Sequence, residues 1–222
     1  MARTRCWVVT GVVLAFALSA CLADAEVVGK TTGPLDATKA REAESSLGNL
    51  VADAARASLK AEIALVPASQ LRDVTLPAGD LTREALSNAL LYPDEKTVLV
   101  EVTGAQVRAA LERGLSMLPG KPNAAFLQVS GLAVTFRSDA PEGQRVLGVQ
   151  VGGSALVAER NYKAAMPSSL AKGALGYFRV FDGLKPTQTG AAISDAVVDL
   201  VRGKTISPQS GRLRDLAPPP EK

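Results

Sequence analysis

The chain has 222 residues, a length that suits one full-sized domain. Its net charge of +3 is too small to indicate a polybasic surface, so nucleic acid is a poor candidate partner. Hydrophobic residues make up 47% of the sequence, which allows a sizeable core and argues against global disorder. There is no histidine, the residue on which transition-metal sites, two-metal phosphoesterase centres and Ser-His-Asp triads usually depend. We therefore expect no metal site, no cofactor and no hydrolytic centre, although an all-carboxylate magnesium site or a Ser-Lys pair needs no histidine.

The N-terminus has the pattern of a signal peptide over residues 1–20. Arg3 and Arg5 precede an apolar run over 6–20, shorter than the ~20 residues of a transmembrane helix. Leu18-Ser19-Ala20-Cys21 matches the bacterial lipobox, in which the cysteine becomes the acylated first residue of a lipoprotein. Ala23-Asp24-Ala25 instead fits an ordinary signal peptidase site.

The cysteine count favours the lipid anchor. Cys6 would leave with the leader, so Cys21 would be a single thiol without an intramolecular partner in an oxidising compartment. Acylation gives this residue a role, whereas cleavage after Ala25 removes it. We predict a protein exported to the bacterial periplasm or cell surface and anchored to the membrane through lipid on Cys21, with soluble secretion as the alternative.

Beyond the leader, the sequence predicts one domain over 26–213 and a disordered tail over 214–222. Apolar residues at helical spacing predict a helix over Glu44–Lys60, followed by a strand over Glu62–Val66. A second strand is predicted over Lys96–Val102. Thr103 and Gln106 then have the spacing of a capping box that opens another helix.

Two further strands are predicted to form a hairpin. Leu132, Val134 and Phe136 alternate with polar residues, and so do the apolar residues at 147, 149 and 151. A last helix, with apolar residues at 193, 197, 200 and 201, is expected to end before Gly203. Hairpins between separated helices favour the α+β class over a doubly wound parallel sheet.

Several segments, in order and in register, resemble the C-terminal domain of the 5′-nucleotidase family. They are Glu44–Asp53 (ESSLGNLVAD), Ala64–Asp73 (ALVPASQLRD), Leu76–Thr82 (LPAGDLT), Val98–Gly104 (VLVEVTG), Phe126–Gly131 (FLQVSG) and Leu170–Tyr177 (LAKGALGY). The resemblance implies a four-layer α/β/β/α sandwich that binds the nucleoside part of the substrate. It also implies that the phosphate ester is cleaved by a separate metallophosphatase domain, rich in His and Asp, which we do not find in this sequence.

The family's ligand contacts are largely substituted here. In the family two phenylalanines clamp the base, and their positions align with Pro93 and Ser169. The ribose-binding aspartate aligns with Leu175, and the asparagine of the N-G-G-G-I-R motif aligns with Pro67. Arg72 is retained at a position that contacts substrate in the family.

The candidate ligand-binding residues carried over from the family are therefore Arg72, Tyr92 and Ser169. Tyr92 precedes the lost ring by one residue and could replace it, whereas Arg72 has the alternative of an ion pair with Asp73. Tyr177 and Phe178 are expected in the core or at its edge. Loss of two stacking rings, each worth about 1–3 kcal/mol, would weaken nucleoside binding strongly.

Three hypotheses from different classes follow. The first is a non-catalytic binding module for a small polar or nucleotide-like ligand. The second is the substrate-binding half of a split 5′-nucleotidase that works with a separate metallophosphatase subunit. The third is an interaction protein that keeps the fold without the ligand. The substituted contacts favour the first hypothesis, with a changed ligand, or the third.

Overall fold

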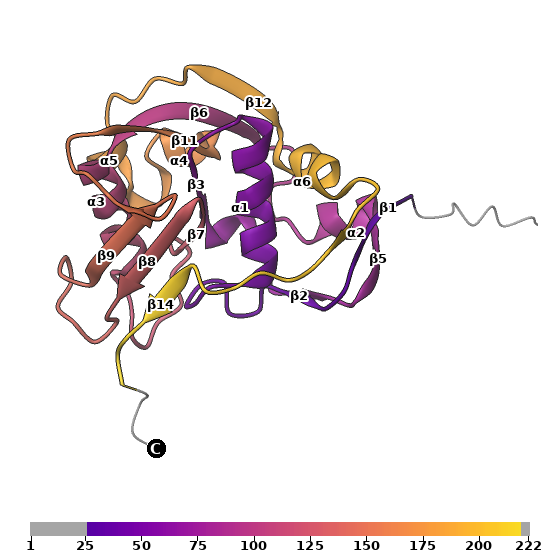
Figure 1. The fold of residues 1–222 in the computed structure, drawn as a ribbon, viewed down its shortest axis with the longest axis horizontal. Helices are drawn as coiled ribbons and strands as arrows, with labels where there is room; N and C mark the ends of the chain where they lie inside the picture. The colour runs from indigo at the N-terminus through magenta and orange to yellow at the C-terminus, as the bar shows by residue number, and fades with distance from the viewer. Residues whose placement is uncertain (1–25, 219–222) are drawn as a thin grey trace, which may run out of the picture.

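The structure, a computed structural model, describes residues 26–218 (Figure 1). The predicted leader, the predicted lipid-attachment residue Cys21 and the last residues of the predicted tail lie outside this range. No helix within the described range is both long enough and apolar enough to cross a membrane.

A five-stranded mixed sheet forms the centre of the domain. Its strands, in spatial order, are β12 (Gln188–Ala192), β6 (Lys96–Thr103), β11 (Asn161–Pro167), β3 (Ile63–Pro67) and β7 (Leu127–Ser130). Strands β11 and β3 pair in parallel, and the other neighbours are antiparallel. All residues of β3 are buried, as expected for a strand that is covered on both faces of the sheet. The strands predicted at 62–66 and 96–102 are confirmed with small shifts of their ends.

The two longest helices pack on this sheet as their apolar patterns predict. Helix α1 (Ser46–Ser58) lies against β3, β7 and β11, with α6 (Ile193–Val201) beside it (Figure 1). Helix α3 (Gly104–Leu115) contacts β6 of the central sheet and also β9 (Val146–Val151). The predicted capping box begins α3: Gln106 N donates to Thr103 Oγ1 at 3.2 Å, and Thr103 N donates to Gln106 Oε1 at 2.9 Å.

A second sheet, of four strands, is joined to the first by the chain between β7 and its own strand β8 (Leu132–Phe136). Its order is β10 (Ser154–Ala155), β9, β8 and β14 (Leu213–Asp215). Gly131 joins β7 to β8 with φ of 73°, and a Cβ at this residue would lie 2.2 Å from Glu62 O. Glycine is therefore required where the chain passes from one sheet to the other. The predicted α+β class, with helices packed over two main sheets, is confirmed.

The remaining elements are short. They are β1 (Val27–Thr31), β5 (Gly79–Thr82) and β13 (Thr205–Ile206) in one sheet, β2 (Leu35–Asp36) and β4 (Thr75–Leu76) in another, and the helices α2 (Arg83–Asn88), α4 (Ser168–Ala171) and α5 (Phe178–Phe181) with the 3-10 turns η1 (Ala68–Gln70) and η2 (Ala174–Gly176).

The alternation predicted for the second hairpin strand is wrong at Leu147. Thr135 pairs with Gly148 while Phe136 pairs with Val146, so Leu147 is the extra residue of a β-bulge. Its side chain is 51% exposed, whereas Val149 is buried as predicted. The bulge reverses the side-chain direction for part of the strand, which a strict period of two does not anticipate.

The predicted domain end at residue 213 is also too early. Strand β14 pairs in parallel with β8 through Asp215, and Leu216 N donates to Phe136 O at 2.8 Å. This strand is held by Glu44, whose carboxylate accepts hydrogen bonds from the backbone N–H groups of residues 211, 212 and 213 at 2.9–3.1 Å. Asp53 adds a bidentate pair with Arg212 at 2.7 and 2.9 Å. Glu44 and Asp53, the first and last residues of the Glu44–Asp53 segment, therefore fasten the C-terminal strand to the domain.

Candidate functional site

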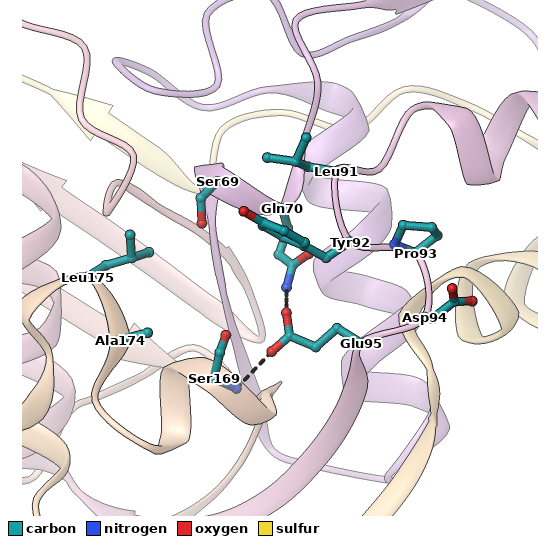
Figure 2. A pocket seen from close by; sticks show the side chains of 10 residues that line it. All are labelled: Ser69, Gln70, Leu91, Tyr92, Pro93, Asp94, Glu95, Ser169, Ala174 and Leu175. Atoms are coloured by element: carbon teal, nitrogen blue, oxygen red, sulfur yellow. Dashed lines mark hydrogen bonds between the residues drawn. The ribbon is translucent and has the colours of Figure 1, made fainter.

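A pocket of about 620 Å³ lies where three short helical segments and one loop meet (Figure 2). Its lining comes from residues 69–70 of η1, from the loop 91–95 between α2 and β6, from Ser169 in α4, and from residues 174–175 of η2. Each segment lies next to a longer strand or helix of the domain. These rigid elements therefore position the pocket wall, and the short segments between them supply its side chains.

Glu95 connects three of these segments. One carboxylate oxygen accepts a hydrogen bond from Ser169 N at 2.7 Å, and the other accepts one from Gln70 Nε2. Figure 2 shows this carboxylate between the Gln70 side chain and the Ser169 backbone. No sequence pattern pointed to Glu95, because its partners lie 25 and 74 residues away along the chain.

Gln70 has one polar atom without a partner. The residue is 1% exposed, and its Oε1 atom has no hydrogen bond to any described residue. A carboxylate only accepts hydrogen bonds, so the contact with Glu95 fixes Nε2 as the atom facing it and leaves Oε1 as the free acceptor. A buried carbonyl oxygen in this state favours a donor from a ligand or from water.

Tyr92 provides the only aromatic ring of the pocket lining, and it is 54% exposed. Its loop is fixed on both sides by backbone hydrogen bonds. Leu91 N donates to Gln70 O at 2.8 Å, and Ser194 N donates to Pro93 O at 3.1 Å. The ring is therefore presented to solvent from an anchored backbone.

Leu175 has a left-handed backbone conformation, with φ of 58°. This conformation costs a residue with a Cβ atom roughly 1–2 kcal/mol, and glycine adopts it readily. The neighbouring Gly173 and Gly176 have φ of 87° and 83°. Arg113 stabilises the turn by donating a hydrogen bond from Nη2 to Leu175 O at 2.8 Å. The turn thus keeps a glycine-type geometry although a leucine occupies its centre.

The aromatic residues after this turn have different positions. Tyr177 is fully buried, donates its hydroxyl to Ala125 O at 2.6 Å, and stacks on Phe181 with ring centroids 5.6 Å apart. Burial raises the pKa of the Tyr177 hydroxyl well above its usual range. Phe178 is 58% exposed. Tyr177 therefore belongs to the core, and Phe178 lies at the surface outside the pocket lining.

The structure brings some of the predicted site residues together and leaves one apart. Tyr92 and Ser169 line the pocket, together with Pro93 and Leu175. Arg72 is not among the lining residues: its exposed side chain donates from Nε to Leu90 O at 3.2 Å. No ion pair with Asp73 is among those formed by residues 26–218.

Two other observations concern possible metal ligands and the position of Pro67. Between residues 26 and 218, no group of three or more His, Cys, Asp and Glu side chains is placed to hold a metal ion. Pro67, which replaces an asparagine of the family motif, is buried at the end of β3 and does not line the pocket.

Comparison with known proteins identifies relatives that are longer than this chain. Trifunctional nucleotide phosphoesterase protein YfkN of Bacillus subtilis is 28% identical over 205 residues, which cover 86% of this chain and 14% of that protein. A 5′-nucleotidase-related protein of Glossina morsitans morsitans is 29% identical over 199 residues, covering 79% of this chain and 35% of that protein. The chain thus spans about a third or less of the length of these relatives.

A solved structure supports the predicted sandwich fold. The 5′-nucleotidase precursor from Thermus thermophilus superposes with a TM-score of 0.79 and 28% identity, over 87% of this chain and 40% of that one. The family described as "5′-nucleotidase, C-terminal domain" matches residues 27–183, which include all the lining residues of the pocket. The chain therefore belongs to the 5′-nucleotidase C-terminal domain family.

Proposed function

We propose that this domain is a ligand-binding module that does not itself hydrolyse phosphate esters and whose ligand differs from a nucleoside. One observation carries the proposal. Pro93, Ser169 and Leu175 stand at the positions that the family resemblance assigns to base and ribose contacts, and all three line one pocket. In this proposal the ligand binds in the same pocket as in the family, but the side chains that line the pocket differ.

The changed residues remove the interactions that a nucleoside would use. Pro93 and Ser169 have no aromatic ring to stack on a base, an interaction worth about 1–3 kcal/mol per base. Leu175 cannot accept a hydrogen bond from a ribose hydroxyl, a contact worth about 1.5–3 kcal/mol when the acceptor is charged. Tyr92 leaves one ring where the family uses two.

A phosphate-release assay tests the non-catalytic part of the proposal. The purified protein should release no phosphate from AMP, ADP or UDP-sugars, with or without manganese, zinc or cobalt. The expectation rests on the side chains of the described residues, which offer no metal-binding cluster. Turnover that increases with the amount of pure protein and disappears with a chelator would refute it.

The second candidate function is the substrate-binding half of a split 5′-nucleotidase. The observation that favours it is the family match over residues 27–183, since the family resemblance assigns substrate binding to this domain and ester cleavage to another. In this case a metallophosphatase encoded next to this gene should show a lower KM for nucleotides when the protein is added. An unchanged KM together with no complex of the two proteins would count against this function.

We also propose that the protein is exported and anchored through lipid on Cys21. The support comes from the order of Arg5, the apolar run 6–20 and the Leu18–Cys21 motif. This location would place the pocket in contact with solutes outside the cytoplasm.

A further inference from the structure

We propose that the Glu95 pocket binds a small organic cation, an ammonium or guanidinium carried on a flat apolar body, and disfavours phosphate-bearing ligands. This inference rests on the proposed function, because it assumes that this pocket is the binding site. It goes further by naming the charge and shape of the ligand.

The two charged side chains that line the pocket are both acidic. Glu95 and Asp94 line it, and no lysine or arginine is among the lining residues. Asp94 is exposed, and its carboxylate points away from Ser169 (Figure 2), so it adds negative charge near the pocket without a direct contact inside. A phosphate would approach these two carboxylates without a compensating cation, whereas a cation would be attracted by both.

Two arginines near the pocket keep their positive charge, but neither is a lining residue. Arg72 lies outside the lining and donates to Leu90 O. Arg113, behind the Leu175 turn, donates to Leu175 O and to Ser116 Oγ at 2.8 Å each. Among the ion pairs of residues 26–218, neither guanidinium forms one with Glu95.

The carboxylate and amide oxygens of the pocket are acceptors, and its three hydroxyls, on Ser69, Tyr92 and Ser169, can donate or accept. Each Glu95 oxygen accepts one hydrogen bond from the protein, which leaves it able to accept another. Gln70 Oε1 is a buried acceptor without a partner, and it cannot exchange places with Nε2 without facing the Glu95 carboxylate. A ligand that satisfies these atoms must donate hydrogen bonds, as ammonium and guanidinium groups do.

The rest of the wall fits a flat apolar body. Tyr92 offers an exposed ring, and Leu91, Pro93 and Leu175 supply apolar surface around it. An aromatic face attracts cations as well as other rings, so Tyr92 favours both parts of such a ligand. Negative charge, free acceptors and one ring thus point to the same ligand class.

Three probes of similar shape test the inference on the unmutated protein: 2-phenylethylammonium, 2-phenylethanol and phenyl phosphate. Each is titrated while the backbone amide signals of the protein are followed by NMR. The ammonium should shift the amides of Glu95, Ser169 and Leu175 and bind about tenfold or more tightly than the alcohol. Phenyl phosphate should leave these signals unchanged.

Variants assign the effect to individual residues. Glu95→Gln should abolish the preference for the ammonium over the alcohol, since it removes the charge and keeps an oxygen acceptor. Glu159→Gln, a matched change at an exposed residue outside the pocket, should retain the preference. Tyr92→Leu should weaken binding of both probes.

The outcomes separate the two levels of the proposal. If the alcohol or the phosphate binds at these residues as tightly as the ammonium, the charge inference is overturned and the pocket remains a binding site. If no probe shifts the lining amides at millimolar concentration, both this inference and the binding site are overturned. Loss of fold in Glu95→Gln leaves the comparison of probes on the unmutated protein decisive.

Discussion

Replacing Glu44 with alanine should detach the C-terminal strand from the domain. The Glu44 carboxylate accepts from Gly211 N at 2.9 Å, from Arg212 N at 2.9 Å, from Leu213 N at 3.1 Å and from Asn49 Nδ2 at 2.6 Å. A hydrogen bond to a charged group is worth about 1.5–3 kcal/mol. Glu44 is half-buried and its contacts share one carboxylate, so the sum is not additive, and we expect a loss of about 3 kcal/mol in the free energy of unfolding.

Urea unfolding and amide hydrogen exchange would measure this effect. Exchange should accelerate at Leu213 and at Leu216, whose N–H groups depend on β14 staying in place. Glu44→Gln, which keeps one acceptor oxygen, should lie between the alanine variant and the unmutated protein. Glu42→Ala provides the control, since Glu42 is an exposed acid in the same segment. A Glu44→Ala variant no less stable than Glu42→Ala would refute the role assigned to Glu44 in holding β14.

Three further predictions concern other parts of the molecule. Tyr177→Phe removes the hydrogen bond to Ala125 O and should lower the free energy of unfolding by about 1–2 kcal/mol. Burial raises the pKa of Tyr177 in the folded state, so the contribution of this hydroxyl to the free energy of unfolding is complete below about pH 10, the pKa in the unfolded chain, and is lost as the pH rises above it. The urea midpoint should therefore fall more steeply above about pH 10 in the unmutated protein than in Tyr177→Phe. Leu175→Asp places a carboxylate in a backbone conformation that Asp tolerates and should raise adenosine affinity about tenfold, as calorimetry can measure; unchanged affinity would argue against the assigned ribose position. Cys21→Ala should release soluble protein or leave an uncleaved precursor, whereas an intact mass that begins at an unmodified Glu26 would exclude the anchor.

Local patterns were sufficient to predict the main elements of the fold. The apolar spacing of α1 and the Thr103–Gln106 capping box depend on neighbours within a few residues, and the structure has both. Leu147 was predicted wrongly because a bulge depends on how two strands pair, not on the sequence of one strand. The short strand β14 was missed because Glu44, which holds it, lies far away in the sequence.

The sequence led to part of the pocket lining and missed the rest. Family resemblance led to Tyr92 and Ser169, and the structure places them at one pocket. The same reasoning selected Arg72, which lies outside the lining, and it did not find Gln70 or Glu95. These two residues became visible only through their contact, because a buried acceptor without a partner is a property of the folded chain.

Calorimetry with adenosine, AMP and inorganic phosphate tests the central claim most directly. The pocket has one ring, Tyr92. Pro93, Ser169 and Leu175 stand where a nucleoside would need two rings and a carboxylate. We predict dissociation constants for adenosine and AMP in the millimolar range or weaker, which corresponds to a binding free energy of about −4 kcal/mol or less favourable. Micromolar binding of adenosine, with heat that disappears in Tyr92→Leu, would show that the nucleoside site is intact and would contradict the account.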